Sequence, residues 1–279
     1  MLSRLIAAIT GPRKTPAPAA AATYVGLMGG LGNQLFQYAY ARYLAARGVA
    51  VDALVTNLFE RDQYGRKPLV QAISRLPAIV LQQEQIATLR IMTGEDGKAL
   101  CDSLLTSGAN GVFCRGYWQD PRYAHVVAAE LAADLQKFGA AYRHAVPSAC
   151  VVHVRRHDYG HHGLLPLQYY RAALECCGQP AFKVVTDEPN FCEYAFTKMP
   201  GYSGVVRGNS ELPWDDFFLM AAAPIQIIAN SSFSWWTAWL GEVSGVTQTI
   251  IAPAEWSLLG PPASCPVSWQ RIEMQLQRP

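Results

Sequence analysis

Residues 227–240 read IIANSSFSWWTAWL, and residues 151–159 read VVHVRRHDY. Each stretch begins as an apolar strand and ends in polar side chains, an amide with hydroxyls in the first and two adjacent guanidiniums in the second. The planar fork of arginine matches pairs of phosphate oxygens, and Asn or Ser at a helix start adds neutral donors. Two such strand ends predict a site for a nucleoside diphosphate.

Strand and helix patterns alternate on both sides of these two stretches. From residue 23, a buried strand, a tight GGLGN turn and a helix ending before Gly48 lead into a further strand. The middle is less regular, with a helix expected over residues 82–92. Past residue 148 strands and helices alternate again, which is typical of parallel, doubly wound sheets. We therefore predict an α/β protein with two Rossmann-like lobes, residues 23–147 and 148–279.

Polar side chains follow several of these strands directly. Ligands of doubly wound sheets bind at the carboxyl ends of the strands. His153 to Asp158, Asp187 and Asn230 to Ser234 all fall at such ends. Three separate segments are therefore expected to meet at one crevice.

Charge and cysteine content limit the classes of partner and compartment. The chain has 279 residues, a formal net charge of +2 and no block of like charges, so a nucleic-acid partner is not expected. Its 7 cysteines show no CxxC spacing, which favours free thiols in a reducing compartment. The apolar runs are shorter than the roughly 18 residues of a spanning helix. We expect a cytoplasmic protein.

Residues 1–22 combine the short apolar segment MLSRLIAAIT with a Pro/Ala-rich stretch. The apolar part is too short for a typical signal peptide. We predict a flexible lead with no strand of its own. The alternative is a weak amphipathic contact that holds the protein peripherally at the inner membrane face.

Three of these motifs also have other interpretations. The GGLGN turn resembles a dinucleotide-binding fingerprint, with Asp52 placed about 20 residues on, but Leu35 occupies the third glycine position. A nicotinamide-dependent oxidoreductase is the alternative function. Residues 230–232 also fit a plain helix N-cap. Trp235 and Trp239 share one helical face and are expected in the core.

Several motifs, in order along the chain, resemble those of the α-1,2-fucosyltransferases of glycosyltransferase family eleven. They are GGLGNQLFQYA from Gly29, RGYWQ from Arg115, HVRRHDY from His153, VVTDE from Val184, DFFLM from Asp216 and IIANSSFSWWTAWL from Ile227. The resemblance spans residues 23 to about 256. It implies a B-type glycosyltransferase fold, with the acceptor mostly on the first lobe and GDP-fucose on the second, and a galactose-containing glycan as acceptor.

The resemblance also implies roles for individual residues. Arg155 and Arg156 correspond to pyrophosphate ligands. His153 and Asp187 correspond to partners of the guanosine. Further phosphate contacts are expected from Asn230, Ser231, Ser232 and Ser234, and contacts with fucose or acceptor from Asn33 and Gln34.

The implied reaction is a single displacement that inverts the anomeric carbon of fucose through an oxocarbenium-like transition state. GDP leaves as an anion, so it needs positive charge and hydrogen-bond donors rather than an acid. The chain holds no Asp-x-Asp pair, so neither a metal nor another cofactor is expected. Asp158 is the first candidate for the base that deprotonates the acceptor, and His157, where the family motif has glycine, is the second.

Overall fold

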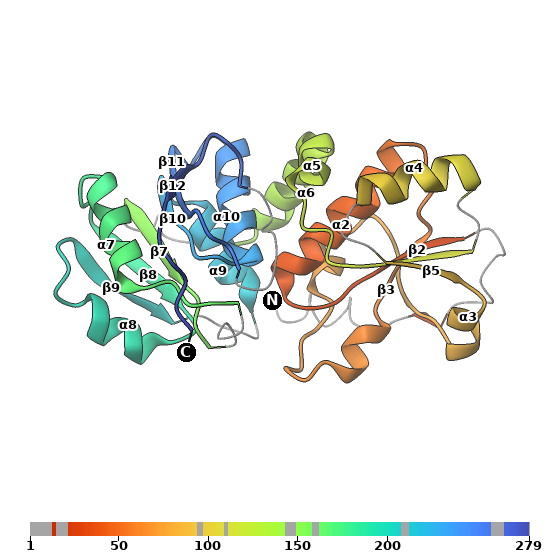
Figure 1. Cartoon of the computed structure of the whole chain (residues 1–279), viewed down its shortest axis with the longest axis horizontal. Coiled ribbons are helices and arrows are strands. Elements are labelled where there is room, and N and C mark those ends of the chain that lie inside the picture. The colour runs from red at the N-terminus through yellow and green to blue at the C-terminus, as the bar shows by residue number, and fades with distance from the viewer. Residues whose placement is uncertain are drawn as a thin grey trace. The chain divides into compact units, whose positions relative to one another are not determined.

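The computed structural model describes residues 13–14, 22–93, 97–108, 111–142, 149–157, 162–207, 212–257 and 265–278 (Figure 1). The chain divides into two compact units, residues 1–134 and 135–279. The division falls earlier than the predicted one between residues 147 and 148. The reason lies in the aromatic side chains at the end of helix α6 (Ala128–Gly139) and beyond it. The rings of Phe138 and Tyr142 lie 6.0 and 5.0 Å from the ring of Phe218, inside the second unit.

The first unit is built on a sheet of 6 strands in the order β1-β4-β3-β2-β6-β5, and every pairing is parallel. Its strands are β1 (Arg13–Lys14), β2 (Thr23–Gly26), β3 (Ala53–Val55), β4 (Ala78–Val80), β5 (Arg90–Thr93) and β6 (Val112–Arg115). Its helices are α2 (Leu31–Ala46), α3 (Gln83–Ala87), α4 (Gly97–Ser107), α5 (Pro121–Val126) and the start of α6, with 3-10 turns η1 (Asn57–Arg61) and η2 (Leu69–Ala72).

Two local predictions for this unit were wrong. The helix expected over residues 82–92 ends at Ala87, and β5 follows it, because residues 90–93 pair with β6. The lead was expected to hold no strand, yet Arg13 pairs with Ile79 and Lys14 with Val80. This pairing gives partners to backbone groups of β4 that an edge strand leaves unpaired.

The second unit is built on a sheet of 6 strands in the order β12-β11-β10-β7-β8-β9. Its strands are β7 (Cys150–Val154), β8 (Phe182–Thr186), β9 (Tyr202–Arg207), β10 (Ile225–Ile227), β11 (Thr249–Pro253) and β12 (Gln270–Ile272). Its helices are the end of α6, α7 (Leu167–Cys176), α8 (Pro189–Phe196), α9 (Pro213–Ala221) and α10 (Ser232–Val243). The predicted pair of parallel α/β sheets is thus confirmed.

Both sheets contain a point at which the strand order reverses. In the second unit successive strands run outward from β7 in one direction and from β10 in the other. In the first unit β2, β3 and β4 run outward in one direction, and the chain then crosses to the opposite edge at β5 and returns inward to β6, beside β2. Such switch points open a crevice at the carboxyl ends of the two strands, because the connections leave in opposite directions.

Both faces of the second sheet are covered, which explains the continuous apolar run of β7. Val152 and Val154 pack with side chains of α7 and α8 on one face, while Val151 packs with Met220 of α9 on the other. Helix α10 is buried nearly all round, and Trp235 and Trp239 lie in the core as predicted. The seven cysteines are free thiols. Among the described residues, no helix combines the length and apolarity needed to cross a bilayer.

A buried polar network fixes the packing of α10 against β10. Gln226, with 0% exposure, donates to Thr247 Oγ1 at 2.9 Å and accepts from Thr237 Oγ1 at 3.1 Å. A Cβ added to Gly241 would lie 2.0 Å from Thr247 Oγ1 and 2.8 Å from Gln226 Nε2. Only glycine therefore fits at this turn of the helix.

We predict that Gly241→Ala lowers the free energy of unfolding by about 2 kcal/mol or more, because the added methyl group breaks the buried hydrogen bonds. Val243→Ala, at an exposed position of the same helix, serves as the control and should change it by less than about 0.5 kcal/mol. Thermal and urea unfolding measure both. Equal stability of the two variants would contradict the packing described.

Candidate active site

A pair of side chains links β7 to α10, the helix that follows β10, at the switch point of the second sheet. His153, at the end of β7, bonds through Nδ1 to the hydroxyl of Ser234 in the first turn of α10, and its ring packs on Phe233. Burial, and then the nearby Arg155, lower the pKa of His153 to about 3. The imidazole is therefore neutral at pH 7. Ser234 is fully buried and its hydroxyl holds His153; its contact with phosphate stays a prediction.

One carboxylate organises the loop that carries the paired arginines. Asp187, just after β8, accepts hydrogen bonds from the backbone N–H of Arg156 at 3.0 Å and of His157 at 3.2 Å. Its Oδ2 also lies 3.1 Å from Nε of Arg155. Both oxygens of Asp187 are thus engaged by the loop after β7. Asp187 therefore holds this loop, and its contact with guanosine stays a prediction.

The two guanidiniums are held at the carboxyl end of β7 in different ways. The side chain of Arg155 is 32% exposed and is oriented through Asp187. The guanidinium of Arg156 lies over the ring of Phe191, 4.0 Å from its centroid, which is cation–π geometry. Arginine stays protonated in proteins, so this loop carries two permanent positive charges beside the switch point.

The residues that precede α10 serve the loops around them. Asn230 is 1% exposed, and its Nδ2 donates to the carbonyls of Gly163 and Trp256, both at 3.0 Å. Both amide hydrogens are used to hold these loops, and the phosphate contact of Asn230 stays a prediction. Ser231 is the N-cap, with Oγ accepting from the N–H of Phe233 at 3.3 Å, which confirms the alternative interpretation. Ser232, the first residue of the helix, is partly exposed.

Of the two candidate bases, only His157 is among the described residues. Asp158 lies outside the described residues, so its role stays a prediction. The side chain of His157 is 71% exposed, and its Nδ1 lies 3.4 Å from Oε1 of Glu188.

In the first unit, Gln34 is a structural residue. It has 0% exposure, and its Nε2 donates to the carbonyls of Gly29 and Lys67, each at 2.9 Å. Its Oε1 accepts from the N–H groups of Leu69 and Val70 at 2.7 and 3.1 Å. The donors and acceptors of the amide are all occupied. These bonds hold the backbone of the first unit, and the contact of Gln34 with fucose or acceptor stays a prediction.

Two further glutamines, absent from the predicted site, connect the GGLGN and RGYWQ segments. Gln37 accepts from the N–H of Met28 at 3.0 Å and donates to the carbonyl of Gly116 at 3.1 Å. Gln119 donates to Oδ1 of Asn33 at 2.7 Å, across the switch point between β2 and β6. A polar residue one turn after Gln34 in an otherwise apolar helix was the available signal for Gln37. Asn33 keeps the partly exposed position that its prediction requires.

Asp52 does not lie where a ribose-binding acid would. It precedes β3, and its carboxylate accepts from the N–H of Thr23 at 2.7 Å, at the amino end of β2. Dinucleotides bind at the opposite, carboxyl edge of such sheets.

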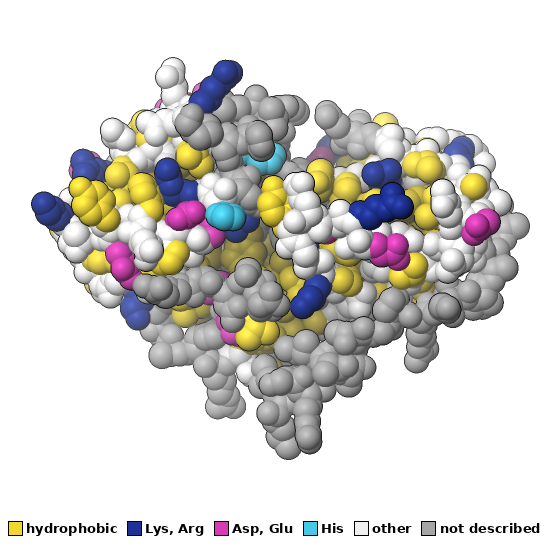
Figure 2. All heavy atoms as spheres, turned by 90° about the horizontal axis from the view of Figure 1, so that it is seen from below, with side chains coloured by type: hydrophobic (Ala, Val, Ile, Leu, Met, Phe, Trp, Pro, Cys, Tyr) yellow, Lys and Arg dark blue, Asp and Glu magenta, His cyan; other side chains and the backbone are white. Residues whose placement is uncertain are grey.

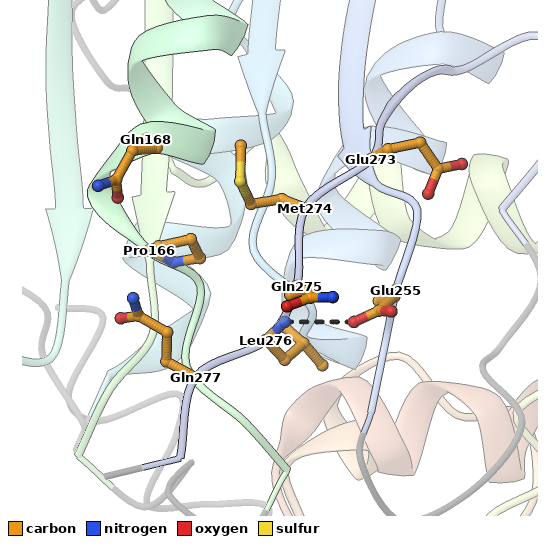
Figure 3. Close-up of a pocket in the computed structure, with 8 residues that line it drawn as sticks. All are labelled: Pro166, Gln168, Glu255, Glu273, Met274, Gln275, Leu276 and Gln277. Carbon is orange, nitrogen blue, oxygen red and sulfur yellow. Dashed lines mark hydrogen bonds between the residues drawn. The ribbon is translucent and has the colours of Figure 1, made fainter.

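A cavity of about 760 Å³ in the second unit lies beside the segments that follow β11 and β12 (Figure 3). Glu255 and Glu273 line it with amide side chains, and Glu255 accepts from the N–H of Leu276 at 3.2 Å. Two carboxylates repel a diphosphate, and none of the predicted site residues lines this cavity. It is therefore a separate feature. On the face in Figure 2, the basic side chains of the described residues lie scattered among acidic and apolar ones.

Two parallel α/β units, with paired arginines at the switch point of the second, have the architecture of a B-type glycosyltransferase. The chain belongs to glycosyl transferase family 11, which it matches over residues 25–258. The resemblance seen in the motifs is thereby confirmed. Family membership, together with the position of Asp52, overturns the alternative of a nicotinamide-dependent oxidoreductase.

Individual relatives agree with this family. The chain is 30% identical to the α-1,2-colitosyltransferase of Escherichia coli over 298 aligned residues, which cover 88% of this chain and 97% of that one. It is 33% identical over 116 residues to the O-antigen biosynthesis glycosyltransferase WbnK of Escherichia coli, and this match covers 38% of each chain. Among solved structures, E. coli ADP-heptose LPS heptosyltransferase II is similar in fold, with a TM-score of 0.50, 10% identity and coverage of 92% of this chain and 91% of that chain.

The neutral state of His153 predicts a pH dependence of stability. The folded pKa of about 3 lies below the ordinary value of 6.5, so the unfolded chain binds the extra proton between these values. The contribution is fully present above pH 6.5 and is lost as pH falls toward 3, by up to about 1.4 kcal/mol per pH unit.

Urea unfolding of His153→Gln between pH 7 and pH 4 should show a smaller loss of stability than the unaltered protein shows. His157→Gln, which changes an exposed histidine of the same segment, should keep the original slope. Identical slopes in all three proteins would mean that His153 is not held neutral.

Proposed function

We propose that this protein is an inverting glycosyltransferase that moves L-fucose from GDP-β-L-fucose to a hydroxyl of a galactoside, forming an α-1,2 linkage. The reaction would serve glycan or surface-polysaccharide synthesis. The observation that carries the proposal is the pair of guanidiniums held at the second switch point through Asp187 and Phe191. Family membership supports sugar transfer, and the name of the colitosyltransferase relative supports the linkage.

The charges in this loop suit the departure of a nucleoside diphosphate. As the bond from the anomeric carbon to the phosphate oxygen breaks, negative charge develops on the pyrophosphate. Two arginines fixed before the reaction stabilise that charge without reorganising, and the N-terminus of α10 adds backbone donors. We propose that this arrangement acts without a metal ion or another cofactor.

The attacking hydroxyl must lose a proton as it bonds to the anomeric carbon. We assign this proton to Asp158, because the family motif also has an aspartate at this position of HVRRHDY, whereas His157 stands where that motif has glycine. Comparing Asp158→Asn with His157→Gly tests the assignment. A base variant should lose transfer but still bind GDP, whereas a residue that only orients the loop should lose both.

A second candidate donor is nucleotide-activated colitose, which the name of the colitosyltransferase relative favours. Product formation from each of the two activated sugars, with one galactoside as acceptor, decides between them. The site of action is proposed as the cytoplasm, with peripheral contact at the inner membrane face as the alternative.

Arg155→Lys keeps the positive charge but loses the planar fork, so turnover of GDP-fucose should fall at least about tenfold. Arg171→Lys, at an exposed position of α7, is the matched control and should retain turnover. GDP release with lactose as acceptor measures both. Near-normal turnover of Arg155→Lys would remove Arg155 from the site.

Chelation tests the role given to the arginines. In excess EDTA the protein should keep more than about half of its rate, because fixed guanidiniums take the charge-stabilising role of a metal. The measurement is GDP release before and after chelation. Complete loss of activity that manganese restores would contradict the proposal.

A further inference from the structure

The switch point of the first unit carries a second polar pair, which the donor site does not use. Asn33 follows β2 and Gln119 follows β6, and the two amides are hydrogen-bonded at 2.7 Å. Both side chains are partly exposed, unlike Gln34 and Gln37 beside them, which are buried. The exposed pair therefore differs from the glutamines that hold the backbone.

The segment Gly116–Gln119 has an unusual backbone that turns one aromatic ring inward and its neighbour outward. Trp118 has a φ of 52°, in the left-handed region that bulky residues rarely adopt. It is 3% exposed and stacks on Tyr40 with ring centroids 4.4 Å apart. Tyr117, directly before it, is 49% exposed. The loop thus holds a strained backbone conformation, and in this conformation Tyr117 lies at the surface.

The neighbouring contacts leave this loop little freedom. Gln37 holds the carbonyl of Gly116 at 3.1 Å, and the N–H of Asp120 donates to the carbonyl of Trp118 at 2.8 Å. A Cβ at Gly116 would lie 2.8 Å from Cε2 of Trp118, so glycine is required there. The backbone that carries the exposed ring is fixed before any ligand arrives, which lowers the entropy lost on binding.

An exposed aromatic ring two residues before one of the paired amides suits a saccharide. The ring offers an apolar face to the C–H groups of a pyranose, while amides both donate to and accept from its hydroxyls. We infer that Tyr117, Asn33 and Gln119 form the subsite for the acceptor sugar, with Tyr117 as the stacking residue that sets acceptor affinity. This inference rests on the proposed function and names the acceptor contacts that it leaves open.

The test compares Tyr117→Ala, which removes the ring, with Tyr117→Phe, which keeps it. For lactose as acceptor, Tyr117→Ala should raise KM at least about tenfold and Tyr117→Phe less than about threefold, with GDP affinity by calorimetry unchanged in both. Gln119→Met, of similar volume but without the amide, should also raise KM for lactose. Tyr194→Ala, at an 87% exposed position of α8, is the control and should change neither quantity.

Direct binding separates this subsite from the proposed function. Saturation-transfer NMR with lactose needs no turnover, and its signal should be lost in Tyr117→Ala and kept in Tyr117→Phe. Unchanged lactose KM and signal in Tyr117→Ala, or equal losses in both variants, would overturn the subsite. Failure of the unaltered protein to bind GDP-fucose by calorimetry would instead overturn the proposed donor, and the NMR comparison would still decide the subsite.

Discussion

Backbone groups in the loops at the carboxyl ends of the strands have no neighbouring strand to pair with, and the structure depends on side chains that satisfy them. Buried amides do most of this. Gln34 holds the turn after β2 to the segment before η2, and Asn230 joins the loops that follow β7 and β11. Asp187 does the same for the arginine loop with a carboxylate. These contacts set where the exposed polar groups lie.

Strands can be predicted from the sequence where they are buried, because burial requires a recognisable pattern of apolar residues. β7 is covered on both faces, so its run of apolar residues identifies it, and the tryptophans of α10 are in the core for the same reason. The strand β5 gives no such pattern, because it lies at the sheet edge and most of its side chains are exposed. The two residues of β1 are too few for any periodicity. These two edge strands are thus defined by their partners and not by their own sequence.

Prediction of the site succeeded in placing side chains and missed that some of them also hold the backbone. The strand ends that carry Arg155, Asp187 and Asn33 are where the alternation of strands and helices placed them. Whether a polar side chain faces a ligand or a backbone carbonyl depends on contacts distant in sequence, as between Asn230 and Gly163. Ser234 and Gln34 were assigned to ligands from sequence alone, and burial adds that both also hold the fold.

The chemistry of the groups that hold these loops also determines how a pH dependence of the reaction rate is interpreted. Amides have no proton that titrates, and the imidazole at the second switch point stays uncharged above its ordinary pKa of 6.5. The frame made by these groups therefore keeps one charge state through neutral and mildly alkaline solution. In that range, a change of rate with pH reports the group that accepts the proton of the attacking hydroxyl, and not a rearrangement of the scaffold that positions it.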